Sequence, residues 1–262
     1  MKKSIVFLVA CCLLYACGSV PLTGRKQMLL VSDSEVVSAS LEQYNEYIKT
    51  APLSTDKTKT ATVERVGKKI AAATEEYLRQ NGLESEIANL KWTFNLVKNE
   101  QVNAFCMPGG KIVVYEGLLP LIASDDELAV VLGHEVAHAV AKHSNERMSQ
   151  ELVAQYGAAI LGETLNRKSA AVQALGNTVF GLGAQYGVML PFSRTHEYEA
   201  DHMGLILMAM AGYKPETAVG FWEKMSAGSA GTTPEVLSTH PSDVHRIAEI
   251  KKYLPEAEKY RK

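Results

Sequence analysis

The sequence predicts a mostly helical α+β fold, in which a small antiparallel sheet precedes a helix that carries the motif His134-Glu-Val-Ala-His138. Apolar residues recur at helical spacing over most of the chain, and only residues 92–115 show the alternating or continuously apolar pattern of strands. With 262 residues, 47% of them hydrophobic and 21% charged, the chain can bury a large core in one or two domains.

The first residues have the pattern of a secretory signal. Two lysines precede an apolar run from Ile5 to Leu14, which is shorter than the roughly 20 residues that a membrane-spanning helix needs. Residues 14–17, Leu-Tyr-Ala-Cys, resemble the lipobox of bacterial lipoproteins, in which the cysteine becomes the lipidated first residue of the mature chain. We therefore expect residues 1–16 to be a lipoprotein signal peptide and Cys17 to carry a lipid anchor. The alternative is an ordinary signal peptide with an incidental cysteine.

The residue after this cysteine indicates a location. Gly18 is not the aspartate that retains many such lipoproteins in the inner membrane, so we expect a bacterial cell envelope protein at the outer membrane, facing the periplasm. Residues 17–31 lack clear periodicity, and we expect a tether there, before a folded domain of residues 32–262. Removing the two lysines of the signal leaves 25 basic against 29 acidic residues, and this net charge of −4 gives no reason to expect nucleic acid.

Two helices are expected before the sheet. The first runs from Asp33 to about Lys49 and begins with a capping box at residues 32–35. The second runs from Thr60 to Gln80, and Asn81-Gly82 is a typical stop signal. Both predictions follow from one apolar stripe at helical spacing in each segment.

Three extended segments are expected next, at residues 92–96, 102–106 and 111–115. A Pro-Gly-Gly turn separates the last two, which favours a small antiparallel sheet. Cys106 lies in the second segment and has no partner for an intrachain disulfide once the signal is removed and Cys17 is blocked. We expect Cys106 to be a small core residue and not a metal ligand.

The segment from Ser169 to Ser193 holds no charged residue and is long enough to cross a membrane. Four glycines and several polar residues dilute its hydrophobicity, which argues against a membrane span. Buried helices or a lid within residues 148–192 are the favoured interpretation, and contact with a membrane surface is the alternative.

The motif at residues 134–138 falls on a helix, because a capping box at residues 124–127 and apolar residues at helical spacing precede it. His134 and His138 share one face of that helix, from which both imidazoles can reach one zinc ion at about 2.0 to 2.1 Å. Glu135 is rotated by about 100° from His134 and is placed as the general base of a hydrolytic zinc site. The alternative is that the two histidines are core residues without a metal, but this interpretation does not explain why a glutamate, Glu135, lies in the middle of the apolar stripe.

A catalytic zinc ion usually has three protein ligands, so a third must come from elsewhere. A helix is expected from about Thr195 to Gly212, with Glu197 and Asp201 on one face. The first of these carboxylates can bind the metal, and the second can accept a hydrogen bond from a ligand imidazole. Glu199 is expected to point away into solvent. From spacing alone, these residues could also be no more than an acidic helix start.

Taken together, four features resemble the M48 family of zinc metallopeptidases, of the soluble lipoprotein kind. They are HEVAH, the Glu-x-x-x-Asp of residues 197–201, NAFCMPGGKIVVYEGLL at residues 103–119, and His240-Pro241 with Arg246. The resemblance runs from about Pro21 to Ile250 and preserves the order of the motifs. It implies a zincin-like metallopeptidase fold with one zinc ion per chain, bound by His134, His138 and Glu197, with Glu135 as general base and Asp201 as partner of a ligand imidazole.

The resemblance also assigns two residues near the C-terminus. In this family a histidine followed by proline approaches the metal, as an extra ligand or as a stabiliser of the oxyanion, and His240 matches it. Arg246 matches an arginine that is thought to support the same charge. The other histidines are expected to be structural or solvated. They are His143, His196, His202 and His245.

The expected function is a zinc-dependent endopeptidase that cleaves cell-envelope proteins during quality control, with misfolded or outer-membrane proteins as substrates. An extended substrate is expected to pair with the sheet edge at residues 103–106 or 111–115. One alternative is an envelope chaperone or assembly factor whose protease site is latent because His240 occupies the open position. A scaffold with a purely structural zinc ion is a third possibility.

Overall fold

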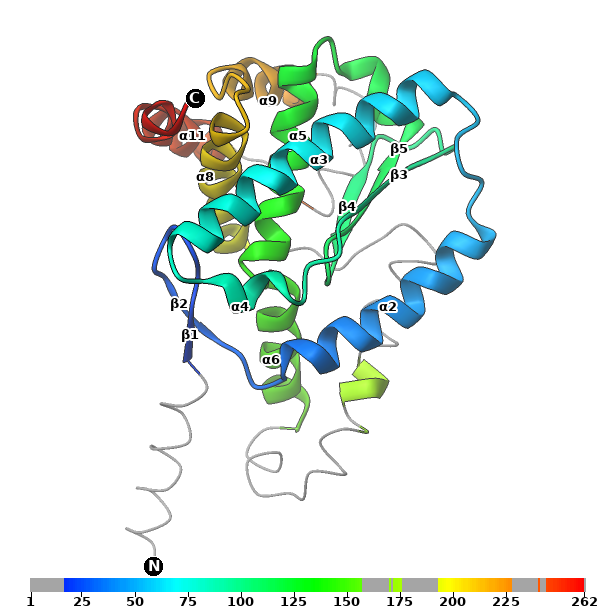
Figure 1. Cartoon of the computed structure of the whole chain (residues 1–262), viewed down its shortest axis with the longest axis vertical. Coiled ribbons are helices and arrows are strands. Elements are labelled where there is room, and N and C mark those ends of the chain that lie inside the picture. The colour runs from blue at the N-terminus through cyan, green and yellow to red at the C-terminus, as the bar shows by residue number, and fades with distance from the viewer. Residues whose placement is uncertain are drawn as a thin grey trace, which may run out of the picture.

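The computed structural model describes residues 17–156, 170, 172–175, 193–227, 240 and 244–261 (Figure 1). The prediction of a mostly helical α+β fold is confirmed. The strands are β1 (Cys17–Ser19), β2 (Lys26–Met28), β3 (Thr93–Val97), β4 (Ala104–Met107) and β5 (Lys111–Tyr115). The main helices are α2 (Asp33–Thr50), α3 (Lys57–Gln80), α4 (Glu84–Ile87), α5 (Asp125–Val140), α6 (His143–Tyr156), α8 (Arg194–Met210), α9 (Thr217–Ala227) and α11 (Val244–Ala257). Short 3-10 turns follow β5 at Glu116–Leu121 and α11 at Glu258–Tyr260.

The central sheet has the strand order β3-β5-β4. Strands β4 and β5 form the expected antiparallel pair, but β3 runs parallel to β5, so the prediction of an all-antiparallel sheet was wrong for this pair. The chain leaves β3, forms β4 at the far edge, and returns through β5 between the two. Apolar alternation reports which face of a strand is buried and not which neighbour it pairs with, so the sequence did not reveal this order.

Helices cover both faces of the sheet, as Figure 1 shows with α3 and α2 on opposite sides. One face packs against α3 and α5 through alternate strand residues such as Phe94, Ile112 and Val114. The other face packs against α2 and α6 through residues such as Phe105 and Val113. The sheet therefore holds α5, the helix with the histidine motif, against its β4 side.

Helices α5 and α8 approach each other through two glycines. A Cβ atom on Gly133 would lie 2.9 Å from the backbone oxygen of Gly204, and one on Gly204 would lie 2.9 Å from the backbone nitrogen of His134. Atoms that close must move apart, so a side chain at either position would separate the helices. This contact brings the side chains of α8 next to those of His134 and His138.

The segment before α2 differs from the sequence prediction of a tether. Strands β1 and β2 form a hairpin with Cys17 opposite Met28, and Val20 between them is 2% exposed and belongs to the main core. Strands of three residues are too short to show alternation, which is why the sequence gave no signal for them. The hairpin is part of the folded body, and two of its side chains enter the polar network described below.

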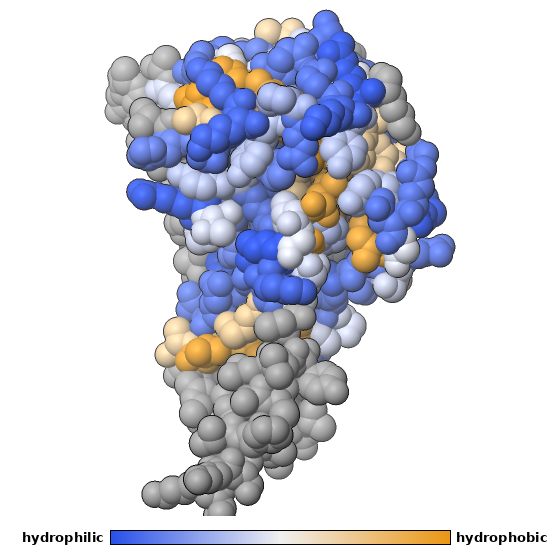
Figure 2. All heavy atoms as spheres, turned by 90° about the vertical axis from the view of Figure 1, so that its left-hand side faces the viewer, coloured by the Kyte–Doolittle hydropathy of each residue, from blue (hydrophilic) through white to orange (hydrophobic). Residues whose placement is uncertain are grey.

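The face drawn in Figure 2 is mostly hydrophilic, with small separate apolar patches. Among the described residues, no helix combines the length and the apolar character that a membrane crossing requires. Of the predicted lid at residues 148–192, the structure describes residues 148–156, 170 and 172–175. The rest of it lies outside the described residues, as does most of the uncharged segment 169–193, for which membrane contact was the alternative.

Candidate metal centre

Four side chains from three parts of the fold converge on one point. His134 and His138 come from α5 and Glu197 comes from the first turn of α8, while His240 precedes α11. One potential ligand atom from each lies within 4.8 Å of the others, and none of the four residues is more than 3% exposed. The structure therefore brings together the three residues predicted as ligands and the histidine predicted to approach them.

Local sequence explains how α5 and α8 present these groups. The Ser124 side chain accepts a hydrogen bond from the Glu127 N–H and begins α5, as the capping box predicted. The Ser193 side chain does the same for the His196 N–H at the start of α8. The helical spacing of four then places the two histidines of α5 on one face, with their rings 4.6 Å apart.

The atoms at the centre of this cluster are all electron-pair donors. His134 Nδ1 lies 2.9 Å from a carboxylate oxygen of Asp201, so that nitrogen carries the proton and Nε2 has a free lone pair. His134 Nε2 faces His138 Nε2 at 3.0 Å, His240 Nδ1 at 3.1 Å and the Glu197 carboxylate at 3.4 Å. Lone pairs that face one another in a buried site need a cation or a proton between them. Two or three imidazoles and a carboxylate are a donor set that suits zinc.

Asp201 and Arg246 support the cluster from behind His134. The Arg246 guanidinium donates to both Asp201 oxygens, with Nε 2.6 Å from Oδ2 and Nη2 2.8 Å from Oδ1. Burial raises the pKa of Asp201, but the charge of Arg246 and its hydrogen bonds outweigh burial and hold the pKa below its usual value. Asp201 is therefore ionised and fixes the tautomer of His134, in the position that the sequence predicted for it.

Arg246 is buried within the cluster and stacks on an aromatic ring. Its Cζ atom lies 3.8 Å from the Trp222 ring centroid, and its Nη1 lies 3.2 Å from Glu197 Oε2 and 3.3 Å from the backbone oxygen of His240. The resemblance implied that Arg246 supports charge on the reacting group. Its contacts with Asp201 and Glu197 show that it also orients these two carboxylates.

Glu135 lies beside the cluster with one unengaged oxygen. The residue is 1% exposed, and its Oε1 lies 3.5 Å from His240 Nε2. Its Oε2 is buried and has no hydrogen-bond partner among the described residues. A cavity lined by His134, Glu135 and His240, with apolar walls from Leu118 and Trp222, lies next to it. A buried carboxylate oxygen with free lone pairs beside such a cavity can accept a proton from a water molecule there.

Two residues that the sequence assigned to solvent or to a structural role lie buried behind the cluster: His143 contacts His138, and Glu199 contacts His143. His143 is fully buried, and its Nδ1 lies 2.8 Å from Nδ1 of His138. Its Nε2 lies 3.0 Å from Glu199 Oε2, and Glu199 is only 7% exposed, so the prediction of a solvated Glu199 was wrong. In one continuous helix, a residue five positions after His138 would face away from it.

The chain does not continue as one helix between these histidines. Lys142 has a φ of 54°, which ends α5 and starts α6 in a new direction, so that His143 turns back towards His138. No glycine or asparagine marks this turn, and the sequence therefore holds no local signal for it. Among the remaining histidines, His196 and His202 pair with Glu146 and Glu256, and His245 is exposed.

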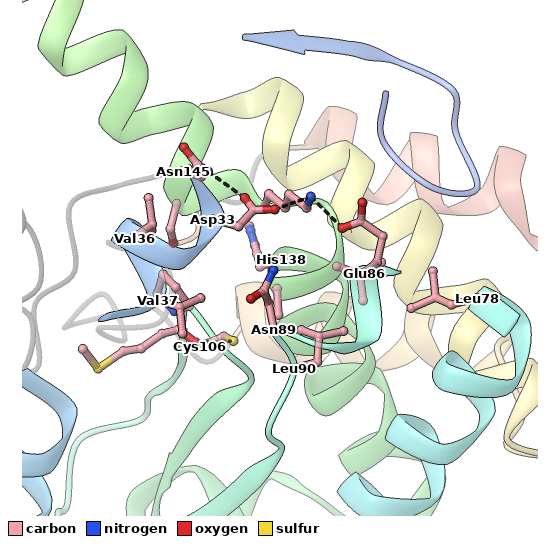
Figure 3. Close-up of a pocket in the computed structure, with 17 residues that line it drawn as sticks. Asp33, Val36, Val37, Leu78, Glu86, Asn89, Leu90, Cys106, His138 and Asn145 are labelled. Carbon is pink, nitrogen blue, oxygen red and sulfur yellow. Dashed lines mark hydrogen bonds and ion pairs between the residues drawn. The ribbon is translucent and has the colours of Figure 1, made fainter. Parts of the chain in front are cut away.

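Another cavity is lined in part by His138 (Figure 3). Its volume is about 570 Å³, and its walls come from α2, α4, the end of β4 and the α5–α6 turn. Lys142 in this wall pairs with Asp33 at 2.5 Å and with Glu86 at 2.6 Å, so its charge is compensated. Cys106, also in the wall, is a buried free thiol whose pKa is raised by burial, which agrees with the core role predicted for it.

Comparison with known proteins agrees with this geometry. The sequence profile described as Peptidase family M48 matches residues 58–254, which include all four converging residues, Glu135, Asp201 and Arg246. The chain belongs to peptidase family M48. The M48 match leaves out the β1–β2 hairpin and α2.

Several relatives are similar to this M48 chain. The mitochondrial metalloendopeptidase OMA1 of Schizosaccharomyces pombe is 39% identical over 176 residues, which are 66% of this chain and 50% of the relative. The mitochondrial metalloendopeptidase OMA1 of Danio rerio is 30% identical over 248 residues, or 90% of this chain and 50% of the relative. The beta-barrel assembly-enhancing protease of Escherichia coli strain K12 is 29% identical over 167 residues, or 60% of this chain and 33% of the relative. The matches thus span half or less of each of these relatives.

Proposed function

We propose that the chain is a zinc-dependent endopeptidase in which His134, His138 and Glu197 bind the ion and Glu135 is the general base. The observation that carries the proposal is the convergence of imidazole nitrogens and carboxylate oxygens whose lone pairs face one another within 4.8 Å. Membership of a peptidase family supports it. The free Oε2 of Glu135 beside the cluster supplies the acceptor that hydrolysis requires.

Each residue has a defined part in peptide hydrolysis. Zinc, when bound, supplies a Lewis acid that polarises a carbonyl group and makes water acidic enough to lose a proton near neutral pH. Glu135 Oε2 takes the proton of the attacking water and passes it to the nitrogen of the leaving amine. His240, close to Glu135, can donate a hydrogen bond to the oxyanion that forms. Asp201 and Arg246 hold His134 and Glu197 in orientation, and burial of the cluster excludes bulk water.

Metal analysis and protein digestion test this function together. The purified chain is expected to contain one zinc ion, to digest casein, to lose the digestion on dialysis against a chelator, and to regain it when zinc is returned. Zinc is required because no other described group can both polarise the carbonyl and activate water. Digestion that continues at full rate in the metal-free chain would contradict the proposal.

The substrates that we propose are extended polypeptides of the cell envelope, bound along β4. Strand β5 is central, so of the two edges expected from the sequence only β4 remains. Tyr115 donates to the Asn103 oxygen across the β4–β5 pair, and alternation in an antiparallel ladder then turns the backbone groups of residues 104 and 106 outward. A relative named as a beta-barrel assembly-enhancing protease and the lipid expected at Cys17 support an envelope substrate.

Peptides cut from outer-membrane β-strands provide the test of this substrate mode. We expect such peptides to be cleaved, and methylation of the backbone nitrogens that pair with β4 to reduce cleavage by about tenfold, because each removes one hydrogen bond of about 1 kcal/mol and adds a steric clash. Methylation of nitrogens on the opposite side of the peptide is the matched control. Equal cleavage of all methylated peptides would exclude pairing along β4.

A latent form of the same enzyme is the second candidate, and the position of His240 favours it. Its Nδ1 lies 3.1 Å from both His134 Nε2 and Glu197 Oε1, where it can serve as a fourth ligand and close the open position. If so, His240→Ala is expected to raise casein digestion. If His240 stabilises the oxyanion, the same variant is expected to lower kcat by about 10² to 10³. An unchanged kcat would contradict both roles.

A further inference from the structure

We propose that His143 and Glu199 form a positioning relay behind the metal ligand His138, and that the β1–β2 hairpin holds the outer end of this relay through Arg25. The inference rests on the proposed metal binding, and it adds His143, Thr23 and Arg25, which lie outside the two predicted motifs of α5 and α8. Thr23 and Arg25 also lie outside residues 58–254, the part of the chain that matches the family.

The relay is a continuous path of short polar contacts. It begins at His138, whose Nε2 lies 3.0 Å from His134 Nε2 in the cluster and whose Nδ1 lies 2.8 Å from His143 Nδ1. It continues from His143 Nε2 to Glu199 Oε2 at 3.0 Å. Side-chain exposure is 2% for His138, 0% for His143 and 5% for Glu199. Water therefore does not compete with the contacts between the rings.

The direction of each hydrogen bond follows from the first one. When His138 binds a metal through Nε2, its neutral ring carries the proton on Nδ1, which must then donate to His143. His143 accepts at Nδ1, so its own proton is on Nε2 and is donated to Glu199. A carboxylate at the end of such a chain fixes the orientation of both rings and makes the ligand nitrogen of His138 a stronger electron donor.

The hairpin holds the carboxylate at the end of this path. Thr23 Oγ1 donates to Glu199 Oε1 at 2.5 Å, and Arg25 Nε donates to Glu199 Oε2 at 2.7 Å. The other side of the Arg25 guanidinium makes a two-pronged contact with Glu146, at 2.6 and 3.0 Å. Arg25 thus links α6 and α8 at the point where the relay ends.

The two metal-binding histidines of α5 are therefore supported in the same way. His134 contacts Asp201, which is held by the fork of Arg246. His138 contacts Glu199 through His143, and Arg25 holds that carboxylate. In both cases an imidazole is oriented by a carboxylate that an arginine neutralises. Removing such a partner typically weakens metal binding by about 10- to 100-fold.

Zinc affinity, measured on the full chain by competition with a chelator of known affinity, tests the relay. We expect His143→Leu to weaken zinc binding by about 10- to 100-fold. His143→Gln is expected to stay within about threefold of the wild type, because its amide oxygen can accept from His138 while its amide nitrogen donates to Glu199. Arg25→Met is expected to lose less zinc affinity than His143→Leu, since the contacts from His138 through His143 to Glu199 stay intact.

His202→Leu is the matched control. It removes a histidine that lies 2.8 Å from the Glu256 carboxylate and stacks on Tyr253, and neither of these two residues belongs to the cluster or to the relay. We expect it to bind zinc as the wild type does. Wild-type affinity in His143→Leu, or equal losses in His143→Leu and His202→Leu, would overturn the relay. A wild-type chain that binds no zinc would instead overturn the proposed function.

A second test uses the zinc-loaded wild type and so does not depend on whether a variant folds. Long-range proton–nitrogen NMR spectra of the histidine rings report which ring nitrogen carries the proton. The relay requires the proton of His143 on Nε2 and that of His138 on Nδ1. A proton on Nδ1 of His143 would contradict the proposed direction, because His138 could then not donate to it.

Discussion

Replacing Glu135 with glutamine is expected to lower peptide hydrolysis by about 10² to 10⁴-fold, the usual contribution of a general base, while zinc content stays that of the wild type. The amide has the shape of the carboxylate but cannot accept the proton of water. Residue 135 lies beside the predicted ligands, with Oε1 3.5 Å from His240 Nε2. The substitution therefore leaves the ligand atoms of His134, His138 and Glu197 unchanged. His134→Ala is expected to lose both zinc and activity.

The measurement compares kcat on a fluorogenic peptide with zinc content by atomic absorption. Glu64→Gln is a suitable control, since Glu64 forms an exposed pair with Lys68 on the surface of α3 and should leave both quantities unchanged. Equal proteolysis by the wild type and Glu135→Gln would falsify the assignment of the base. Loss of zinc in Glu135→Gln would show that this carboxylate is a ligand.

Replacing Arg246 with methionine is expected to lower the free energy of unfolding by about 3 to 5 kcal/mol, the usual cost of leaving one partner of a buried ion pair unpaired. Arg246 is fully buried, and its removal leaves the Asp201 carboxylate buried without its cation. The pKa of Asp201 is held down mainly by that arginine against the effect of burial, so the carboxyl group is expected to take up a proton. His134 then loses its acceptor, and zinc binding weakens.

Arg65→Met provides the matched control for this prediction. Arg65 makes the same forked contact with an aspartate, at 2.6 and 3.0 Å from Asp125, but its side chain is 56% exposed. Water replaces the lost contact there, so we expect the free energy of unfolding to be nearly unchanged. Chemical denaturation of both variants without zinc measures the difference. If Arg246→Met and Arg65→Met both lost only a little free energy of unfolding, burial would not control the strength of the Arg246 contact.

The parts of the site that helical spacing decides could be predicted from the sequence. The positions of His134, Glu135 and His138 on α5 follow from one capping serine and a period of 3.6 residues. The same reasoning placed Glu197 and Asp201 on one face of α8. The resemblance supplied His240 and Arg246, because no local pattern connects residues that far along the chain to α5.

The parts that depend on how the chain changes direction could not be predicted. The backbone at Lys142 has a φ of 54° without a glycine, and this turn alone brings His143 to His138. The parallel pairing of β3 with β5 depends on the path of the connections and not on the strand residues. The contribution of Thr23 and Arg25 depends on a hairpin with three residues in each strand, which leaves no periodicity to read.

X-ray absorption at the zinc edge, combined with an anomalous difference map of crystals of the zinc-loaded chain, tests the central claim most directly. The account predicts one zinc ion between α5 and α8, with Nε2 of His134, Nε2 of His138 and a carboxylate oxygen of Glu197 at about 2.0 to 2.2 Å. A chain that takes up no zinc, or a zinc ion bound away from these three side chains, would contradict it.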